Sequence, residues 1–187
     1  MRLNIYLISH PLIKQLSLDV INTNLKNERV YQYNAKLLGH LLIYETIRKW
    51  ITIHYISIKN IDSKKELYKF DPKESYKILT NLVECGDIVS DINTILPQMY
   101  LQHINSNNGS QNSYKYINII KKEKIIIIEK FLNSYSITRL LDYLLIEKKV
   151  QINQIKIMCI TCSNSICEYL GNKYKSLEIY TTKMYKY

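Results

Sequence analysis

Hydrophobic and polar residues change their spacing several times in the first 75 positions, and each change predicts a new element. A short alternating segment ends at Ile8, just before Pro11. From 27 to 50 the apolar residues recur at intervals of three and four, which predicts a helix. Positions 51–58 have a period of two, which predicts a half-buried strand, and the polar stretch up to Ser75 predicts a loop. The expected buried face of the helix consists of Val30, Tyr33, Leu37, Leu41 and Tyr44.

In the rest of the chain, short apolar runs alternate with helical patterns. Strands are predicted at 76–79, 99–104, 114–120, 125–128, 155–160 and 177–180. Helices are predicted at 87–96, 137–148 and 163–171. The Asn- and Ser-rich stretch 105–113 predicts an exposed loop. Buried strands that alternate with helices predict an α/β fold, in which helices flank a parallel sheet.

The composition is that of a globular protein, with 47% hydrophobic and 22% charged residues in a chain of 187. The sequence has 31 Ile, 22 Lys, 17 Asn and 17 Tyr, whereas Ala occurs once, at Ala35. The abundant types have AT-rich codons and the scarce types GC-rich codons, so nucleotide bias explains much of the net charge of +10. Nucleic acid is not expected as a partner, because nucleic-acid surfaces favour Arg and the excess here is Lys.

The densest basic runs, at 121–124 and 148–149, flank apolar segments. We interpret them as solvated loop ends, with a weak surface for RNA or an acidic ligand as the alternative.

No apolar run approaches the ~20 residues that span a bilayer, so no membrane contact is expected. The amino terminus lacks the apolar segment of a secretory signal and the Arg- and Ser-rich pattern of a transit peptide, so we expect the protein to function where it is made. Four cysteines in this context indicate a reducing compartment. With the AT-rich bias, this favours an organelle-encoded protein of the plastid (chloroplast); the alternative is a cytoplasmic protein, such as one encoded by an AT-rich bacterial genome.

Three segments share a pattern with one enzyme family. The first is His10-Pro11-Leu12, followed by Gly-His-Leu-Leu-Ile-Tyr-Glu at 39–45; the family opens with H-P-L and then G-x-L-L-x-Y-E. The second, 124–136 with the helix that follows, is similar to the family's I-I-V-D-P-M-L-A-T-G-G-S loop. The third, 155–160 with 177–181, is similar to the last core strand and a Y-T-A segment. In this order and over nearly the whole chain, the sequence resembles the uracil phosphoribosyltransferases.

The resemblance implies a type I phosphoribosyltransferase-like fold, a parallel sheet flanked by helices. It implies one domain over 1–187, with a helix and strand region at 1–60 and an α/β core at 76–187. The family makes UMP and pyrophosphate from uracil and phosphoribosyl pyrophosphate with Mg²⁺, and its members dimerise, so a homodimer is a possible assembly. In the family loop the acidic residue holds the ribose hydroxyls, and glycines let the backbone wrap the 5-phosphate. By resemblance, the remaining phosphoribosyl pyrophosphate loop consists of Glu129, Lys130, Asn133, Ser134 and Ser136.

The chain departs from the family pattern where the chemistry is demanding. Tyr135 and Ser136 replace the two glycines, and their side chains are expected to enter the phosphate space. The family's R-A-G segment aligns with 84–86, where Glu84 replaces the arginine. The family also continues well past Y-T-A into a uracil-recognition segment, whereas this chain ends at Tyr187. We therefore expect a shortened, degenerate homologue without activity, whose catalytic residues are unknown.

Other functions stay open as hypotheses. One is a non-catalytic regulator that binds a nucleotide, RNA or a uracil- or UMP-like ligand. Another is a structural subunit that pairs with an intact homologue or with itself. A third is a weakly active uracil phosphoribosyltransferase, for which Mg²⁺ and phosphoribosyl pyrophosphate are implied; otherwise no cofactor is assigned.

Two polar clusters are compatible with metal binding but have simpler explanations. Cys159, Cys162 and Cys167 have no nearby His to complete a site, so we expect them to be buried packing residues. Glu84, Asp87 and Asp91 are predicted on one side of a helix, where acidic residues in the first turn favour the helix dipole. No metal site is expected.

Overall fold

Six strands form one sheet in the computed structural model, which describes residues 3–22, 27–61, 63–96, 98–104, 114, 116–120 and 122–185. The strand order is β1-β8-β7-β6-β4-β5. All five pairings are parallel, so the carboxyl ends of the strands lie along one edge. This confirms the predicted α/β fold. The strands are β1 (Asn4–Leu7), β4 (Tyr76–Thr80), β5 (Met99–His103), β6 (Lys124–Leu132), β7 (Ile155–Ser163) and β8 (Glu178–Tyr185).

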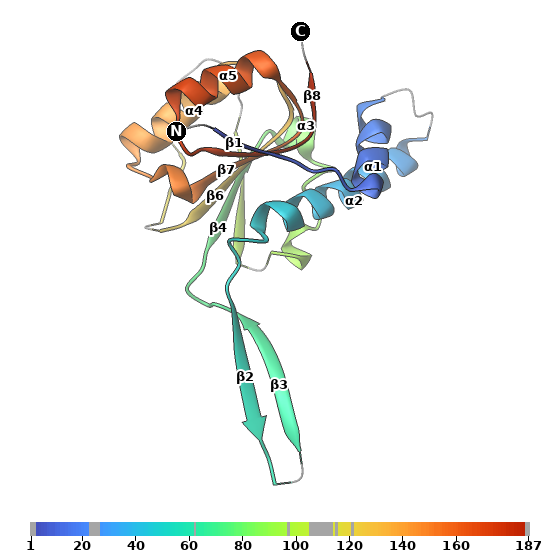
Figure 1. Cartoon of the computed structure of the whole chain (residues 1–187), viewed down its shortest axis with the longest axis vertical. Helices are drawn as coiled ribbons and strands as arrows, with labels where there is room; N and C mark the ends of the chain where they lie inside the picture. The colour runs from blue at the N-terminus through green and yellow to red at the C-terminus, as the bar shows by residue number, and fades with distance from the viewer. Residues whose placement is uncertain are drawn as a thin grey trace.

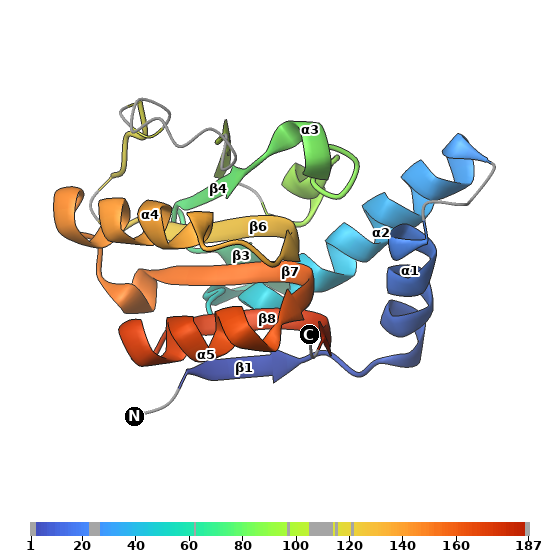
Figure 2. The same cartoon turned by 90° about the horizontal axis from the view of Figure 1, so that it is seen from above.

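Helices cover both faces of the sheet (Figure 2). On one face lie α1 (Pro11–Ile21) and α2 (Glu28–Ile47), and on the other α4 (Ser136–Asp142) and α5 (Asn164–Lys173). A five-residue π-helix, Tyr143–Glu147, continues α4. Alternate isoleucines of β6 belong to the two cores: Ile125 and Ile127 pack beneath α4 and α5, and Ile126 and Ile128 beneath α1 and α2. The run of four isoleucines is therefore buried on both sides, as in other parallel sheets.

Helix α2 forms as predicted, but the predicted buried face is wrong. Val30, Tyr33 and Tyr44 are exposed, at 43%, 66% and 55%. The buried face is displaced by one position and contains the small residues Ala35 and Gly39. A Cβ at position 39 would lie 1.8 Å from the carbonyl oxygen of Ile88, so only glycine permits this close approach. The buried members of α2 are Ala35, Leu38, Gly39, Leu42, Ile43, Thr46 and Ile47.

A two-stranded hairpin projects from the sheet (Figure 1). It consists of β2 (Ile53–Lys59) and β3 (Lys64–Phe70), which pair antiparallel. The first strand was predicted as half-buried, yet every residue of both strands is exposed. The predicted loop up to Ser75 is wrong because β3 lies within it. Its residues alternate only weakly in polarity, so the pairing partner was not evident.

Two further predictions in the middle of the chain fail. The predicted helix at 87–96 is replaced by α3 (Leu82–Cys85), turns and a short 3₁₀ helix, Ile92–Thr94. Asp91 has a left-handed backbone with φ of 54°, which interrupts an α-helix. The described part of 114–120 forms turns and irregular structure rather than a strand. The predicted loop at 105–113 lies outside the described residues.

Candidate functional site

The segment that resembles the phosphoribosyl pyrophosphate loop begins inside a strand. The predicted strand ended at Ile128, but β6 continues to Leu132, because Phe131 and Leu132 still pair with Thr161 and Cys162 of β7. Glu129 and Lys130 are therefore strand residues, and only 133–135 connect β6 to α4.

Alternation along β6 separates these two charged side chains. Glu129 is buried, with 9% of its surface exposed, and lines a small cavity at the carboxyl end of the strand. Lys130 instead donates a hydrogen bond from Nζ to the hydroxyl of Tyr31 at 2.9 Å, on α2. The lysine is also 5.3 Å from the centre of that ring. Of the two, only Glu129 faces the candidate site.

The cavity beside Glu129 has a volume of about 50 Å³. Binding pockets for small molecules usually measure about 300–1,000 Å³. Two carboxylates line it, those of Glu84 and Glu129, and none of the described residues around it is a cation. Burial, helped by the charge of Glu84, raises the pKa of Glu129 to about 7. The lining residues are Glu84, Glu129, Phe131, Leu132, Asn133, Ser134, Ser136 and Ile137.

The remaining residues of the predicted loop are only partly where the sequence placed them. Asn133, Ser134 and Ser136 line the cavity. The hydroxyl of Ser134 accepts a hydrogen bond from the backbone N–H of Ser136 at 3.2 Å, so the loop occupies this donor itself. Tyr135 was expected to enter the phosphate space, but it does not line the cavity. Its ring lies edge-on to Tyr169 of α5, with 5.1 Å between the ring centres.

Glu84 was recognised from the sequence as the replacement for a family arginine and as a member of an acidic row on a predicted helix. The structure adds that it shares the cavity with Glu129. The expected helical row of Glu84, Asp87 and Asp91 does not form, since α3 ends at Cys85 and Asp91 pairs with Lys36. The described residues contain no group of three His, Cys, Asp or Glu side chains arranged to hold a metal ion.

The cysteines are packing residues, as predicted. Cys159, Cys162 and Cys167 are each at most 2% exposed and belong to the core beneath α4 and α5. Burial raises the pKa of the Cys159 thiol well above its usual range.

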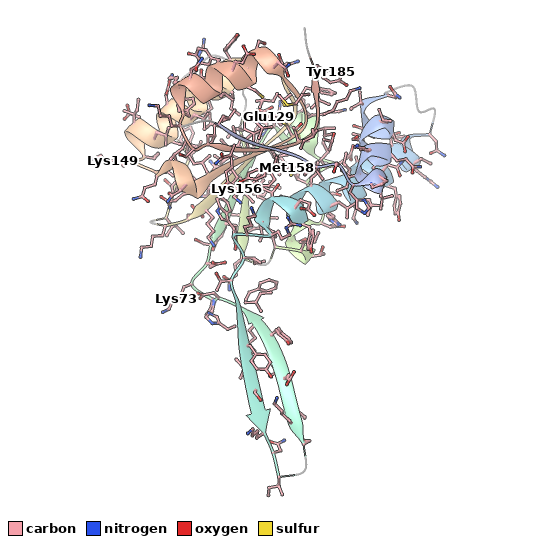
Figure 3. The ribbon with its side chains drawn as sticks, viewed as in Figure 1. Lys73, Glu129, Lys149, Lys156, Met158 and Tyr185 are labelled. Carbon is pink, nitrogen blue, oxygen red and sulfur yellow. The ribbon has the colours of Figure 1, made fainter. Side chains whose placement is uncertain are left out.

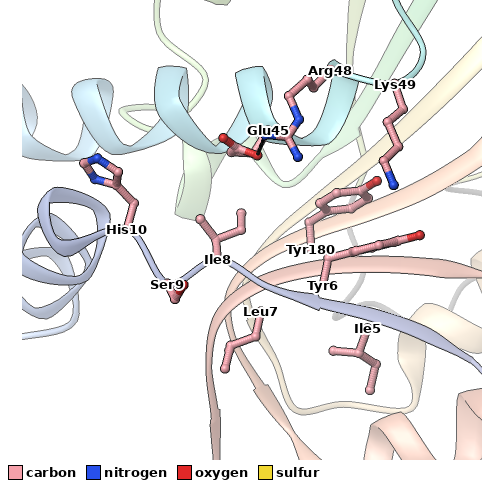
Figure 4. A pocket seen from close by; sticks show the side chains of 10 residues that line it. All are labelled: Ile5, Tyr6, Leu7, Ile8, Ser9, His10, Glu45, Arg48, Lys49 and Tyr180. Atoms are coloured by element: carbon pink, nitrogen blue, oxygen red, sulfur yellow. Dashed lines mark ion pairs between the residues drawn. The ribbon is translucent and has the colours of Figure 1, made fainter.

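A larger cavity, which the sequence did not predict, lies between β1 and the end of α2 (Figure 4). Its volume is about 520 Å³. The rings of Tyr6 and Tyr180 stack at 4.7 Å on one wall, and Arg48 and Lys49 line another. His10 also lines it.

The amino-terminal part of the family resemblance now has a structural explanation. His10 precedes Pro11, the first residue of α1, and its Nδ1 accepts a hydrogen bond from the backbone N–H of Leu12 at 3.2 Å. Glycine is required at position 39 because the backbone of α2 lies close to the carbonyl oxygen of Ile88. At the end of α2, Glu45 forms an ion pair with Arg48 at 3.4 Å. These residues therefore cap and pack helices.

The parallel sheet, with a strand, an acidic residue and a helix at its carboxyl edge, has the phosphoribosyltransferase-like α/β architecture that the family resemblance implies. Two relatives identify the family. The uracil phosphoribosyltransferase homologs of Porphyra purpurea and Pyropia yezoensis are each 30% identical to this chain over 98% of its length and 89% of theirs. The chain belongs to the uracil phosphoribosyltransferase family.

More distant comparisons agree with this. The uracil phosphoribosyltransferase of Nicotiana tabacum is 24% identical over 96% of this chain and 83% of its own. Among solved structures, the AQ2163 protein from Aquifex aeolicus has the same fold, with a TM-score of 0.69 and 15% identity. That match covers 97% of this chain and 88% of the other. No family model matches the sequence.

No helix among the described residues is both long enough and apolar enough to cross a membrane.

Proposed function

We propose that this chain is a uracil phosphoribosyltransferase homologue that has lost phosphoribosyl transfer. The observation that carries the proposal is the cavity of about 50 Å³ at the family's phosphate loop, lined by the carboxylates of Glu84 and Glu129. Its volume is well below the usual size of a ligand pocket. Phosphoribosyl pyrophosphate is a polyanion, so the carboxylate of Glu84, at the position where the resemblance implies an arginine, opposes its binding.

The chemistry of the reaction supports the same conclusion. Departure of pyrophosphate requires cations that stabilise the developing charge, and removal of one such stabilising group typically lowers the rate about 10²- to 10³-fold. The residues around the cavity do not fit Mg²⁺ with its pyrophosphate, since the space of about 50 Å³ is too small for that group and no described lining residue is a cation that could stabilise it. The hydroxyl of Ser134 already accepts a hydrogen bond from the backbone N–H of Ser136. We therefore derive no catalytic step at this site.

The test is the formation of UMP from labelled uracil, phosphoribosyl pyrophosphate and Mg²⁺ by the purified chain. We expect no product above that of the Glu129→Ala variant, and no heat of binding for phosphoribosyl pyrophosphate in calorimetry. UMP formation by the unmodified chain that Glu129→Ala abolishes would instead establish the weakly active enzyme. A Tyr135→Gly/Ser136→Gly variant tests whether the missing glycines alone account for the loss.

A structural role as a homodimer is the second candidate, and the hairpin of β2 and β3 favours it. An isolated two-stranded hairpin is marginally stable in water, so this one needs a partner surface. One of its faces carries the cross-strand pairs Tyr55–Tyr68 and Ile53–Phe70, all exposed. The rings of Tyr55 and Tyr68 contact each other at 5.4 Å between centres. A second copy of the chain would bury this aromatic face.

The protein is proposed to act in a plastid. The preference for residues with AT-rich codons supports an organelle gene. A relative from Arabidopsis thaliana, 21% identical over 96% of this chain, bears the name uracil phosphoribosyltransferase, chloroplastic. Immunoblotting of purified plastids against a cytosolic fraction tests this, and enrichment in the cytosol would contradict it.

A further inference from the structure

The two densest lysine runs of the sequence meet at one cavity. Lys122 and Lys124 come from the start of β6, and Lys148 and Lys149 from the segment before β7. These four side chains line a cavity of about 740 Å³, and no Asp or Glu is among its lining residues. Each run alone is compatible with a solvated loop end. Their convergence produces a concave surface with an excess of positive charge, which attracts anions.

This lysine cavity is separate from the family's phosphate site. Lys124 is the first residue of β6 and Glu129 lies further along the same strand, towards its carboxyl end. Because all strands are parallel, the lysine cavity lies at the amino edge of the sheet. Figure 3 shows Lys149 at this edge, apart from Glu129. Loss of the original reaction therefore does not bear on this surface.

The lysines differ in how firmly they are held. Lys124 donates hydrogen bonds from Nζ to the carbonyl oxygen of Trp50 and to Glu74, each at 2.5 Å. Lys148 lies 5.5 Å from the ring centre of Tyr143. Lys122 and Lys149 are exposed turn residues with φ of 71° and 54°, and neither forms an ion pair with any described residue. These two ammonium groups are free to meet a ligand.

The other groups of the cavity are suited to a nucleobase. Trp50 lines it, and the buried Lys156 holds this indole in place with Nζ 4.4 Å from the ring centre. Stacking of a base on an aromatic side chain typically contributes about 1–3 kcal/mol. The side-chain amides of Gln151 and Asn153 also line the cavity, and amides both donate and accept hydrogen bonds at base edges.

We propose that the lysine cavity binds single-stranded RNA, with the lysines on its backbone phosphates and a base stacked on Trp50. A single strand is the form that fits, because its bases are unstacked and reach an aromatic side chain, whereas those of a duplex are enclosed. Lysine contacts to phosphate carry little sequence information, so we expect weak sequence preference.

The experiment uses Trp50, which is the only tryptophan of the chain, as a reporter within the proposed site. A dye-labelled oligouridylate is titrated with the full chain by fluorescence anisotropy, and an unlabelled one is titrated into the chain while Trp50 emission is followed. We expect saturable binding, and quenching of Trp50 emission over the same concentration range. We also expect the logarithm of the association constant to fall by about 0.7 for each tenfold rise in salt concentration and for each phosphate neutralised. Binding that leaves Trp50 emission unchanged would overturn the proposal, as would the absence of binding at low salt.

Two variants of equal net charge separate the cavity from general attraction. Lys122→Glu/Lys149→Glu should weaken binding at least about tenfold and abolish the quenching. The control, Lys14→Glu/Lys175→Glu, changes exposed lysines on α1 and after α5 and should bind within about twofold of the unmodified chain. An equal loss in both variants would overturn the proposal. The milder variant Lys122→Gln/Lys149→Gln should bind RNA with an affinity between those of the unmodified chain and the charge-reversal variant. It keeps the test valid if the charge reversal impairs folding.

A free nucleotide is the alternative ligand, because it carries the same phosphate and base groups as RNA. UTP should displace the oligonucleotide only at a much higher concentration than unlabelled oligouridylate does. Displacement by UTP at equal or lower concentration would assign the cavity to a free nucleotide and overturn the proposal for RNA.

Discussion

Glu129 and Glu84 line the same cavity, and the charge of Glu84 adds to burial in raising the pKa of Glu129 to about 7. In an active site, a carboxylate in this position would be held ionised by cations or by hydrogen bonds from the ligand. Here the described residues around the cavity include no cation, and the folded state favours the protonated acid. The pair therefore makes stability depend on pH in a defined direction.

The first prediction concerns how the free energy of unfolding changes with pH. Because the folded pKa of Glu129 lies above its ordinary value of 4.5, the folded state binds the extra proton, and stability decreases as pH rises from about 4.5 through 7. Glu129→Gln removes this ionisation. We expect the variant to be more stable than the unmodified chain at pH 8, by at most about 3 kcal/mol, with the difference diminishing towards pH 5. Urea unfolding at a series of pH values measures it.

Glu147→Gln is the matched control, since Glu147 is exposed and far along the chain from the cavity. Its stability difference from the unmodified chain should be within about 0.5 kcal/mol at every pH. A pH-independent effect of Glu129→Gln would show that the carboxyl is ionised in the folded state throughout this range.

The second prediction concerns Gly39. Replacing a glycine by alanine within a helix usually stabilises it by up to about 1 kcal/mol. At position 39 the added Cβ would meet the carbonyl oxygen of Ile88 at 1.8 Å, and a backbone atom cannot move aside cheaply. We expect Gly39→Ala to destabilise the protein by about 3 kcal/mol or more.

Gly171→Ala in α5 is the comparison, because its Cβ would lie 3.2 Å from the Cβ of Leu3, a contact that a shift of a few tenths of an ångström relieves. Its effect should be within about 1 kcal/mol in either direction. Thermal unfolding followed by circular dichroism measures both variants. Equal stability of the two would refute the close-approach explanation for the glycine in the family motif.

The sequence predicts the sheet core well and the surfaces of its elements poorly. The isoleucine run at 125–128 favours a strand buried on both sides, because central strands of parallel sheets are apolar on both faces, and these isoleucines do pack into both cores. In α2 the same abundance of apolar residues made two faces look alike, so the pattern selected Tyr33 and Tyr44 although Ala35 and Gly39 are the ones that pack. Close packing is specified by small residues, which hydrophobic periodicity does not weigh.

The candidate site shows the same limit. The order of segments pointed to Glu129 and its loop by resemblance alone, as it did to the substitution at Glu84. The orientation of Tyr135 towards Tyr169 and the meeting of Lys122 with Lys149 both depend on contacts between distant segments. The hairpin was missed because its strands are stabilised by cross-strand pairs rather than by a buried face.

The third prediction tests the hairpin as a dimer arm. We expect the unmodified chain to be a dimer in size-exclusion chromatography with light scattering. Tyr55→Ser/Tyr68→Ser removes the exposed aromatic pair and should weaken dimerisation by about 2 kcal/mol or more, or roughly thirtyfold in the dissociation constant. The monomer should keep its fold, because neither side chain is buried in the sheet core.

Ile56→Ser/Ile58→Ser changes the opposite face of the hairpin and provides the control. It should dimerise like the unmodified chain. A monomeric unmodified chain, or equal weakening by both variants, would count against an interface on the face of Tyr55 and Tyr68.

The last prediction concerns Lys156, a lysine with only 2% of its surface exposed. Its Nζ donates hydrogen bonds to the carbonyl oxygen of Thr46 at 2.9 Å and to the hydroxyl of Tyr180 at 3.1 Å, and lies 3.1 Å from the carboxylate of Glu178. Burial lowers the pKa of Lys156, while the ion pair opposes that effect. Removing one member of a buried pair commonly costs about 3–5 kcal/mol, because the other charge is left without a partner.

Glu178 is 29% exposed, however, so water can solvate it when the lysine is absent. We therefore expect Lys156→Met, which preserves most of the side-chain volume, to cost only about 1–2 kcal/mol. Lys156→Ala adds a cavity beneath Trp50 and should cost about 3 kcal/mol or more. Urea unfolding followed by Trp50 emission measures both, with exposed Lys175→Ala as the control within about 0.5 kcal/mol. Equal losses for Met and Ala would show that the charge and its hydrogen bonds, rather than the packing of the lysine stem, stabilise this part of the core.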